Sequence, residues 1–106
     1  MKINALFTYG TLMQGEKANH YLRGIKGSWQ SAYVFGRWIN NDFVKYPIIK
    51  LDIFGEKIMG ELFCSGQLAN IIKILDEYEG PKYKRSISRV YLKDNSVKLA
   101  YIYELA

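Results

Sequence analysis

The sequence is poor in the residues that build disulfide-linked or metal-bound folds. Among 106 residues there is one cysteine, Cys64, and one histidine, His20. A single cysteine excludes an internal disulfide, and a single histidine excludes a metal site made of several histidines. We therefore expect no metal and no cofactor, and a fold held together by its hydrophobic core.

Long apolar runs are also missing. No stretch approaches the roughly 20 apolar residues that span a bilayer, and the apolar part of the opening MKINALFTYG is too short for a signal peptide. One cysteine also fits a reducing compartment. We expect a cytoplasmic protein with no membrane partner. The length leaves no room for two domains, so we expect a single domain over residues 1–106.

Acidic residues are outnumbered by basic ones, 10 against 15, which gives a net charge of +5. A basic balance can indicate nucleic-acid binding. The basic residues are scattered, however, and the densest group is Lys82, Lys84, Arg85 and Arg89. In a strand such charges form a solvated face, or they help to attract an anionic small substrate. No nucleic-acid-binding motif accompanies them, so we expect no nucleic-acid partner. A basic barrel with salt-dependent oligonucleotide binding is the least favoured hypothesis.

Hydrophobic residues make up 49% of the chain and aromatic residues 15%, which is enough for one core. Apolar and aromatic runs predict strands over 3–9, 29–40, 43–51, 58–64, 82–92 and 97–105. A short helix is predicted over 16–22, and the main helix over 67–79. Pro47 interrupts the third run and places it at an edge or a bend. This order predicts an α+β domain built on a small mixed, mostly antiparallel β-barrel with one main helix.

One residue of the main helix does not fit its surroundings. Leu68, Ile72, Leu75 and Glu79 are spaced 4, 3 and 4 residues apart, so they form one stripe along a helix. Glu79 thus continues an apolar face into the last turn, whereas Glu77 lies on the opposite, solvated face. A carboxylate there meets the negative end of the helix dipole and is partly buried. Both effects raise its pKa towards the range of a general acid/base. The alternative is that Glu79 ends the helix loosely and reaches solvent.

A second feature is the junction Phe7-Thr8-Tyr9-Gly10-Thr11-Leu12, where an aromatic strand runs into a loop. Such a junction can present backbone N–H groups to a ligand carboxylate, and glycine allows the backbone to approach closely. The alternative is an ordinary tight turn. Cys64 ends a strand and is interpreted as a packed thiol, because no second histidine is present to activate it.

Four stretches of the chain, in this order, resemble the γ-glutamylcyclotransferase-like superfamily, particularly its short members related to γ-glutamylamine cyclotransferase. They are LFTYGTLMQGEKANHYL near the start, Tyr46-Pro47, IMGELF from Ile58, and LDEYEG from Leu75 with the YKR and AYIY segments that follow it. The Tyr-Gly-Thr-Leu element is weak alone. Paired with the Leu-Asp-x-x-Glu-Gly element some 65 residues later, it is fairly specific. Met13 departs from the pattern, because many relatives carry a basic residue there.

The resemblance implies roles for particular residues. Glu79 matches the catalytic glutamate of the family, and Tyr83 matches a tyrosine near its pocket. The substrate loop is matched by Tyr9, Gly10, Thr11 and Leu12. The implied fold is a small mixed barrel with flanking helices.

The implied reaction cyclises a small-molecule γ-glutamyl amide to 5-oxoproline and releases an amine. The alternative is a non-catalytic module that binds a small metabolite in the same pocket, because a fold does not fix a function.

Overall fold

The computed structural model describes residues 2–10, 15, 19–39 and 48–106. The strands within these residues are β1 (Ala5–Thr8), β2 (Ser28–Trp38), β3 (Ile49–Leu51), β4 (Glu56–Cys64), β5 (Tyr83–Leu92) and β6 (Val97–Leu105). The helices are α1 (His20–Arg23), the 3₁₀ helix η1 (Leu68–Asn70) and α2 (Ile72–Glu79).

Five of the strands close into a barrel in the order β2, β4, β1, β6 and β5. The barrel closes because β5 pairs back onto β2, with Leu92 opposite Ala32 and Tyr91 opposite Tyr33. The short β3 extends the sheet beyond β2. All pairs are antiparallel except β1 and β6, which run parallel. The predicted small mixed, mostly antiparallel barrel is therefore confirmed.

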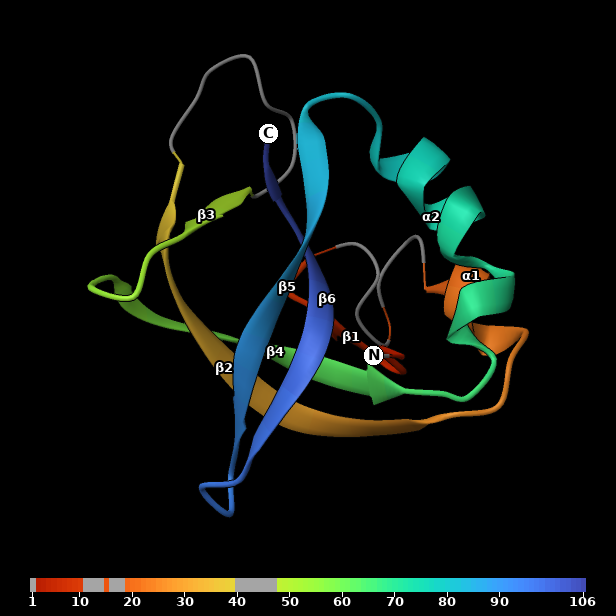
Figure 1. Cartoon of the computed structure of the whole chain (residues 1–106), viewed down its shortest axis with the longest axis horizontal. Coiled ribbons are helices and arrows are strands. Elements are labelled where there is room, and N and C mark those ends of the chain that lie inside the picture. Colours follow the sequence, from red (N-terminus) through yellow and green to blue (C-terminus); the bar gives the residue numbers. More distant parts are fainter. Residues whose placement is uncertain (1, 11–14, 16–18, 40–47) are drawn as a thin grey trace.

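Two hydrophobic cores meet at β1, whose four residues are all buried. Ala5 and Phe7 belong to the core inside the barrel, whereas Leu6 belongs to the core between the barrel and the helices. In Figure 1, α1 and α2 lie together on one side of the barrel. This arrangement explains why Ala5, Leu6 and Phe7 are apolar in succession instead of alternating with polar residues. It also places α2 against the outer face of the sheet.

The main helix differs from its prediction. The 67–79 segment forms two pieces, η1 and α2, because Ile71 leaves helical geometry with φ −120° and ψ −1°. Ser65 is the local cause. Its hydroxyl accepts a hydrogen bond from the N–H of Gln67 at 3.1 Å, and its carbonyl accepts one from Leu68 at 3.3 Å. These bonds turn the chain tightly as it leaves β4, which favours a 3₁₀ turn.

The other predicted elements fall close to the observed ones. The last strand has the predicted bounds, and β5 begins one residue later than predicted. Of the predicted 16–22 helix, residues 16–18 lie outside the described part of the chain, and α1 covers His20–Arg23. The predicted 43–51 strand contains Tyr46 and Pro47, which also lie outside the described residues. Its described part is β3.

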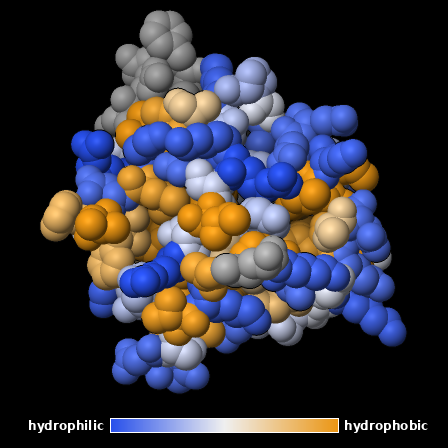
Figure 2. All heavy atoms as spheres, in the orientation of Figure 1, coloured by the Kyte–Doolittle hydropathy of each residue, from blue (hydrophilic) through white to orange (hydrophobic). Residues whose placement is uncertain are grey.

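In the view of Figure 1, β5 and β6 form the side of the barrel nearest the reader. Ile87, Val97 and Leu99 are exposed there, on the outer side of these strands. Figure 2 shows apolar side chains of this kind scattered among hydrophilic ones. Among the residues that the structure describes, every helix is too short or too polar to span a bilayer.

Candidate active site

Glu79 is the last residue of α2 and lies at the end of the helix near β5. Gly80 ends the helix there with φ +79°, a conformation that favours glycine. Glu79 is partly buried, as the apolar stripe predicted, and this burial raises the pKa of its carboxyl group to about 7. At neutral pH the group therefore exists in both protonation states, as a proton-transfer catalyst requires.

Three tyrosines from three different strand regions lie near this carboxyl group. Burial is the main cause that raises the pKa of Tyr9, Tyr83 and Tyr103, and the negative charge of Glu79 raises each of them further. A shared electrostatic effect of this kind requires proximity. The structure thus has Tyr9 and Tyr83, two of the residues selected from the sequence, within electrostatic range of Glu79. It adds Tyr103, which lies in the AYIY segment and for which the sequence predicted no role at the site.

The hydroxyl of Tyr9 is engaged within the protein. It donates a hydrogen bond to the carbonyl of Tyr103 at 2.5 Å and accepts one from the N–H of Ile49 at 3.4 Å. The Tyr9 ring also meets Trp38 edge-on, with ring centres 5.9 Å apart. Tyr9 therefore ties the end of β1 to β6 and β3, which fixes the start of the loop that follows it.

Neither the backbone conformation nor a close contact with a described residue requires glycine at position 10. The φ of Gly10 is not positive, and no described atom lies within 4 Å of the position that a Cβ would take. On the side of the described residues the position is therefore open, which is compatible with a ligand that approaches the backbone. Thr11 and Leu12, the other two residues of the predicted substrate loop, lie outside the described residues.

A cluster that the sequence did not indicate surrounds Asp76 on α2. The hydroxyl of Tyr103 donates to one carboxylate oxygen of Asp76 at 2.7 Å, and Arg85 pairs with the other at 3.2 Å. Arg85 belongs to the basic group for which the sequence left open a solvated face or attraction of an anionic substrate. The residue is exposed, and its guanidinium also pairs with Asp76. This cluster could have been predicted only from the pairing of Arg85 with Tyr103 across β5 and β6. That pairing depends on strand register, which the sequence pattern does not give.

A second acidic residue that the sequence did not indicate is Glu104 in β6, whose side chain is 7% exposed. It accepts hydrogen bonds from the N–H of Leu51 at 3.0 Å and from the hydroxyl of Ser86, and Lys50 lies 3.8 Å away. Together with the Tyr9 hydroxyl, it satisfies N–H groups along the edge of β3. We interpret Glu104 as a structural residue that docks β3 onto the barrel.

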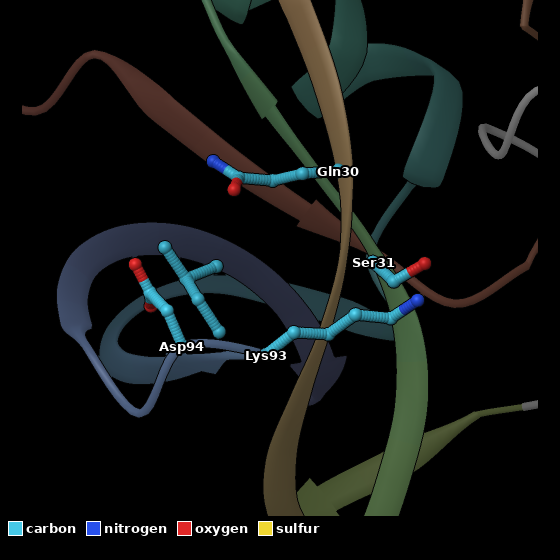
Figure 3. Close-up of a pocket in the computed structure, with 5 residues that line it drawn as sticks. Gln30, Ser31, Lys93 and Asp94 are labelled. Carbon is cyan, nitrogen blue, oxygen red and sulfur yellow. The ribbon is translucent and has the colours of Figure 1, made fainter.

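Other features lie away from Glu79. A shallow depression of about 360 Å³ is lined by Gln30, Ser31, Leu92, Lys93 and Asp94, from β2 and the end of β5 with its following turn (Figure 3). The ten-residue β5 separates it from Tyr83, a distance of roughly 30 Å at about 3.3 Å per residue. No three His, Cys, Asp or Glu side chains gather as a metal site in the described segments. Cys64 packs against the barrel core, and His20 is exposed.

Residues 6–106 match the family model described as "Gamma-glutamyl cyclotransferase, AIG2-like". The chain belongs to this family. The match includes β1 from Leu6 onward, α2 and both C-terminal strands, so every residue of the candidate site lies within the family region. No curated protein matches the chain.

Solved structures share the fold of this AIG2-like chain. YkqA from Bacillus subtilis is 27% identical with a TM-score of 0.75, and the match covers 98% of this chain but only 36% of YkqA. An AIG2-like protein from Mus musculus is 19% identical with a TM-score of 0.69 and coverages of 100% and 79%. A γ-glutamyl cyclotransferase is 14% identical with a TM-score of 0.65 and coverages of 96% and 66%. At these identities the last two show a common fold alone.

Proposed function

We propose that this chain is a γ-glutamyl cyclotransferase that converts a γ-glutamyl amide to 5-oxoproline and a free amine, with Glu79 as its general acid/base. The observation that carries the proposal is the partly buried Glu79 carboxyl, whose pKa burial raises to about 7. It lies near Tyr9, at the strand end that leads into Gly10. Membership of the AIG2-like family supports the reaction class.

The proposed reaction is an internal amide exchange. The α-amine nitrogen of the substrate attacks its own γ-carbonyl carbon, a new C–N bond closes the five-membered lactam, and the original amide C–N bond breaks. The α-ammonium nitrogen loses two protons in all, one before it attacks and one from the tetrahedral intermediate. Glu79 accepts a proton from this nitrogen and gives it to the nitrogen of the departing amine. The other proton is released to solvent, from which the free amine takes up a proton to become an ammonium ion. Because ring closure is intramolecular, positioning of the substrate supplies much of the acceleration. One carboxyl group serves both proton transfers in turn, so the proposed steps use no cofactor.

The substrate loop is proposed to run from Tyr9 to Leu12, with backbone N–H groups that bind the substrate carboxylate or the developing oxyanion. The fixed Tyr9 and the open Gly10 support this assignment. Tyr83 is proposed to line the site beside Glu79, because the two groups interact electrostatically. The group attached to the γ-glutamyl unit is left open by this argument.

The test is a screen of γ-glutamyl amides for release of 5-oxoproline by the wild type and by Glu79→Gln. We expect a loss of roughly 10²–10⁴-fold in Glu79→Gln, the usual contribution of general acid/base catalysis. Glu77→Gln is the matched control, because Glu77 is exposed on the same helix and the same charge is removed. Equal activity of Glu79→Gln and the wild type would remove Glu79 from the mechanism. Tight binding of a γ-glutamyl compound with no product over hours would indicate a metabolite-binding module instead.

A further inference from the structure

The Asp76 carboxylate spans two strands from a position on the helix. One of its oxygens accepts a hydrogen bond from the hydroxyl of Tyr103 on β6, at 2.7 Å, and the other pairs with Arg85 on β5, at 3.2 Å. Arg85 and Tyr103 are directly opposite each other in the β5–β6 ladder, so both side chains leave the same face of the sheet. A single carboxylate of α2 thus binds a cross-strand pair.

Each partner of Asp76 is held in turn. The guanidinium of Arg85 lies over the ring of Tyr101, 4.8 Å from its centre. Tyr103 is 5% exposed, and its backbone carbonyl accepts the hydrogen bond from the Tyr9 hydroxyl. The contacts therefore form a continuous chain from α2, through Tyr103, to the residue that begins the proposed substrate loop.

The same helix carries Glu79 three residues later, one turn beyond Asp76. The helix has only eight residues, and Gly80 ends it directly after Glu79. The last turn of a short helix frays unless tertiary contacts hold it. The side chain of Asp76 supplies two tertiary contacts in this turn, one to Tyr103 and one to Arg85. The backbone carbonyl of Asp76 also accepts a hydrogen bond from the N–H of Gly80.

We propose that Asp76 is a positioning residue: by binding Tyr103 and Arg85, it fixes the last turn of α2 and thereby holds the Glu79 carboxyl beside Tyr9 and Tyr83. The inference rests on the proposed function, in which Glu79 moves the proton. Misplacement of a reacting group by about 1 Å can cost roughly 100-fold in rate. A frayed turn would also hydrate Glu79 and lower its pKa from about 7 towards the ordinary 4.5.

The groups that face Glu79 do not change their charge over the pH range in which the Glu79 carboxyl titrates. The phenols of Tyr9, Tyr83 and Tyr103 come from the end of β1, from β5 and from β6, and burial raises the pKa of each above its ordinary value of 10. They stay neutral at pH 5–8. The carboxylate of Asp76 is paired with Arg85. A change near pH 7 that is absent from Glu79→Gln therefore reports on Glu79.

Two variants remove different parts of the contact. Asp76→Asn removes the charge that Arg85 pairs with, whereas Tyr103→Phe removes the hydroxyl and changes no charge at neutral pH. Glu77→Gln is the control for the loss of a carboxylate on this helix. Tyr101→Phe is the control for the loss of a phenol on β6, because its hydroxyl has no hydrogen-bond partner in the described part of the chain and its ring stays under Arg85.

The kinetic test is the pH dependence of kcat/KM for the best substrate of the screen. We expect both variants to lose roughly 10- to 100-fold in kcat and to move the acid limb of the profile below pH 7. Both controls should keep the wild-type rate and limb. A purely structural role would lower the rate by reducing the amount of folded protein and leave the limb in place, which would overturn the proposal.

A second readout needs no activity. The carboxyl carbon of Glu79, followed by NMR in wild type and variants, should titrate near 7 in the wild type and lower in Asp76→Asn and Tyr103→Phe. An unchanged midpoint would overturn the positioning role even if the chain is a cyclotransferase. A lowered midpoint with no lactam product from any substrate would sustain it and overturn the proposed function. If both variants fail to fold, the contact is structural and the proposal is wrong.

Discussion

Burial of the Glu79 carboxyl has a pH-dependent effect on stability. Its pKa is raised from 4.5 to about 7, so between these values the folded state binds a proton that the unfolded state has released. The free energy of unfolding of the wild type therefore falls as pH rises from about 4.5 to 7 and is lowest, with respect to this group, above pH 7. The sign is opposite to that of a carboxylate stabilised by a salt bridge.

Glu79→Gln should therefore stabilise the protein at pH 8 while it lowers turnover. One pKa unit corresponds to about 1.4 kcal/mol, and partial exposure of Glu79 reduces the full effect, so we expect a gain of about 2 kcal/mol. The gain should vanish at pH 4.5, where both forms are neutral when folded. Urea unfolding of both proteins at the two pH values measures it. A pH-independent difference would contradict the raised pKa.

Gly10 provides a residue-scale test of the substrate loop. Because no described atom lies within 4 Å of a Cβ at this position and its φ is not positive, Gly10→Ala should leave the thermal midpoint within about 2 °C of the wild type. If a substrate approaches the backbone there, the same variant should raise KM, by roughly tenfold for a lost contact of about 1.4 kcal/mol. An unchanged KM would place the ligand elsewhere.

At the scale of single residues, the sequence was informative about Glu79 because one polar residue continued an apolar stripe. The sequence did not predict the contacts of Asp76 and Glu104. Asp76 lay at the edge of the stripe, and Glu104 lay in a strand whose partners were unknown. Their roles depend on Tyr103 and Ser86, which reach them only through the register of β5 and β6.

At the scale of elements, strand positions followed from apolar and aromatic runs, and the last strand was predicted with its observed bounds. The main helix was predicted too long at its start. The apolar spacing of Leu68 and Leu75 is the same whether the intervening turn is α or 3₁₀, and both side chains are fully buried. The turn type was set instead by the Ser65 hydrogen bonds, which the hydrophobic pattern does not encode.

The same two pieces explain how the helix serves the site. The 3₁₀ turn anchors the chain through Leu68, and α2 then carries the polar contacts of Asp76 to the sheet and ends at Glu79. An element only eight residues long is stabilised mainly by such tertiary contacts. We therefore expect substitutions at its C-terminal end to disturb the position of Glu79 most.

For the whole molecule, closure of the barrel depends on a short pairing of β2 with β5. Only two residue pairs form it, and the rings of Tyr33 and Tyr91 stack across it with centres 5.3 Å apart. Phe35 meets the Tyr91 ring edge-on at the same distance. These contacts lie at the end of β5 opposite Tyr83, so barrel closure and the proposed site occupy different ends of the strand.

Tyr91→Ala should therefore separate stability from catalysis. Loss of two aromatic contacts and their buried area should lower the free energy of unfolding by about 2–3 kcal/mol. The folded variant should keep the wild-type kcat/KM, because Glu79 and its tyrosines are untouched. Denaturant unfolding and the 5-oxoproline assay on the same sample check both statements. A selective loss of kcat with unchanged stability would show that the two ends are coupled.

The overall architecture was accessible from the sequence because many strands and one main helix leave few ways to bury the apolar faces. The parallel pairing of β1 with β6 could not be predicted, because an apolar run indicates a strand but not whether it pairs in a parallel or an antiparallel way. The resemblance of the Tyr-Gly-Thr-Leu and Leu-Asp-x-x-Glu-Gly elements joined the two ends of the chain. In the structure Tyr103 connects these elements, because its carbonyl accepts a hydrogen bond from the Tyr9 hydroxyl and its hydroxyl donates one to Asp76.

The central claim is that the Glu79 carboxyl, whose pKa lies near neutral pH, performs the proton transfers. The most direct measurement is kcat/KM from pH 5 to 9 for a γ-glutamyl amide that yields 5-oxoproline. The account predicts an acid limb with a midpoint near 7 in the wild type, about tenfold per pH unit below it, and no such limb in the residual activity of Glu79→Gln. A limb near 4.5, or a profile that Glu79→Gln leaves unchanged, would contradict it.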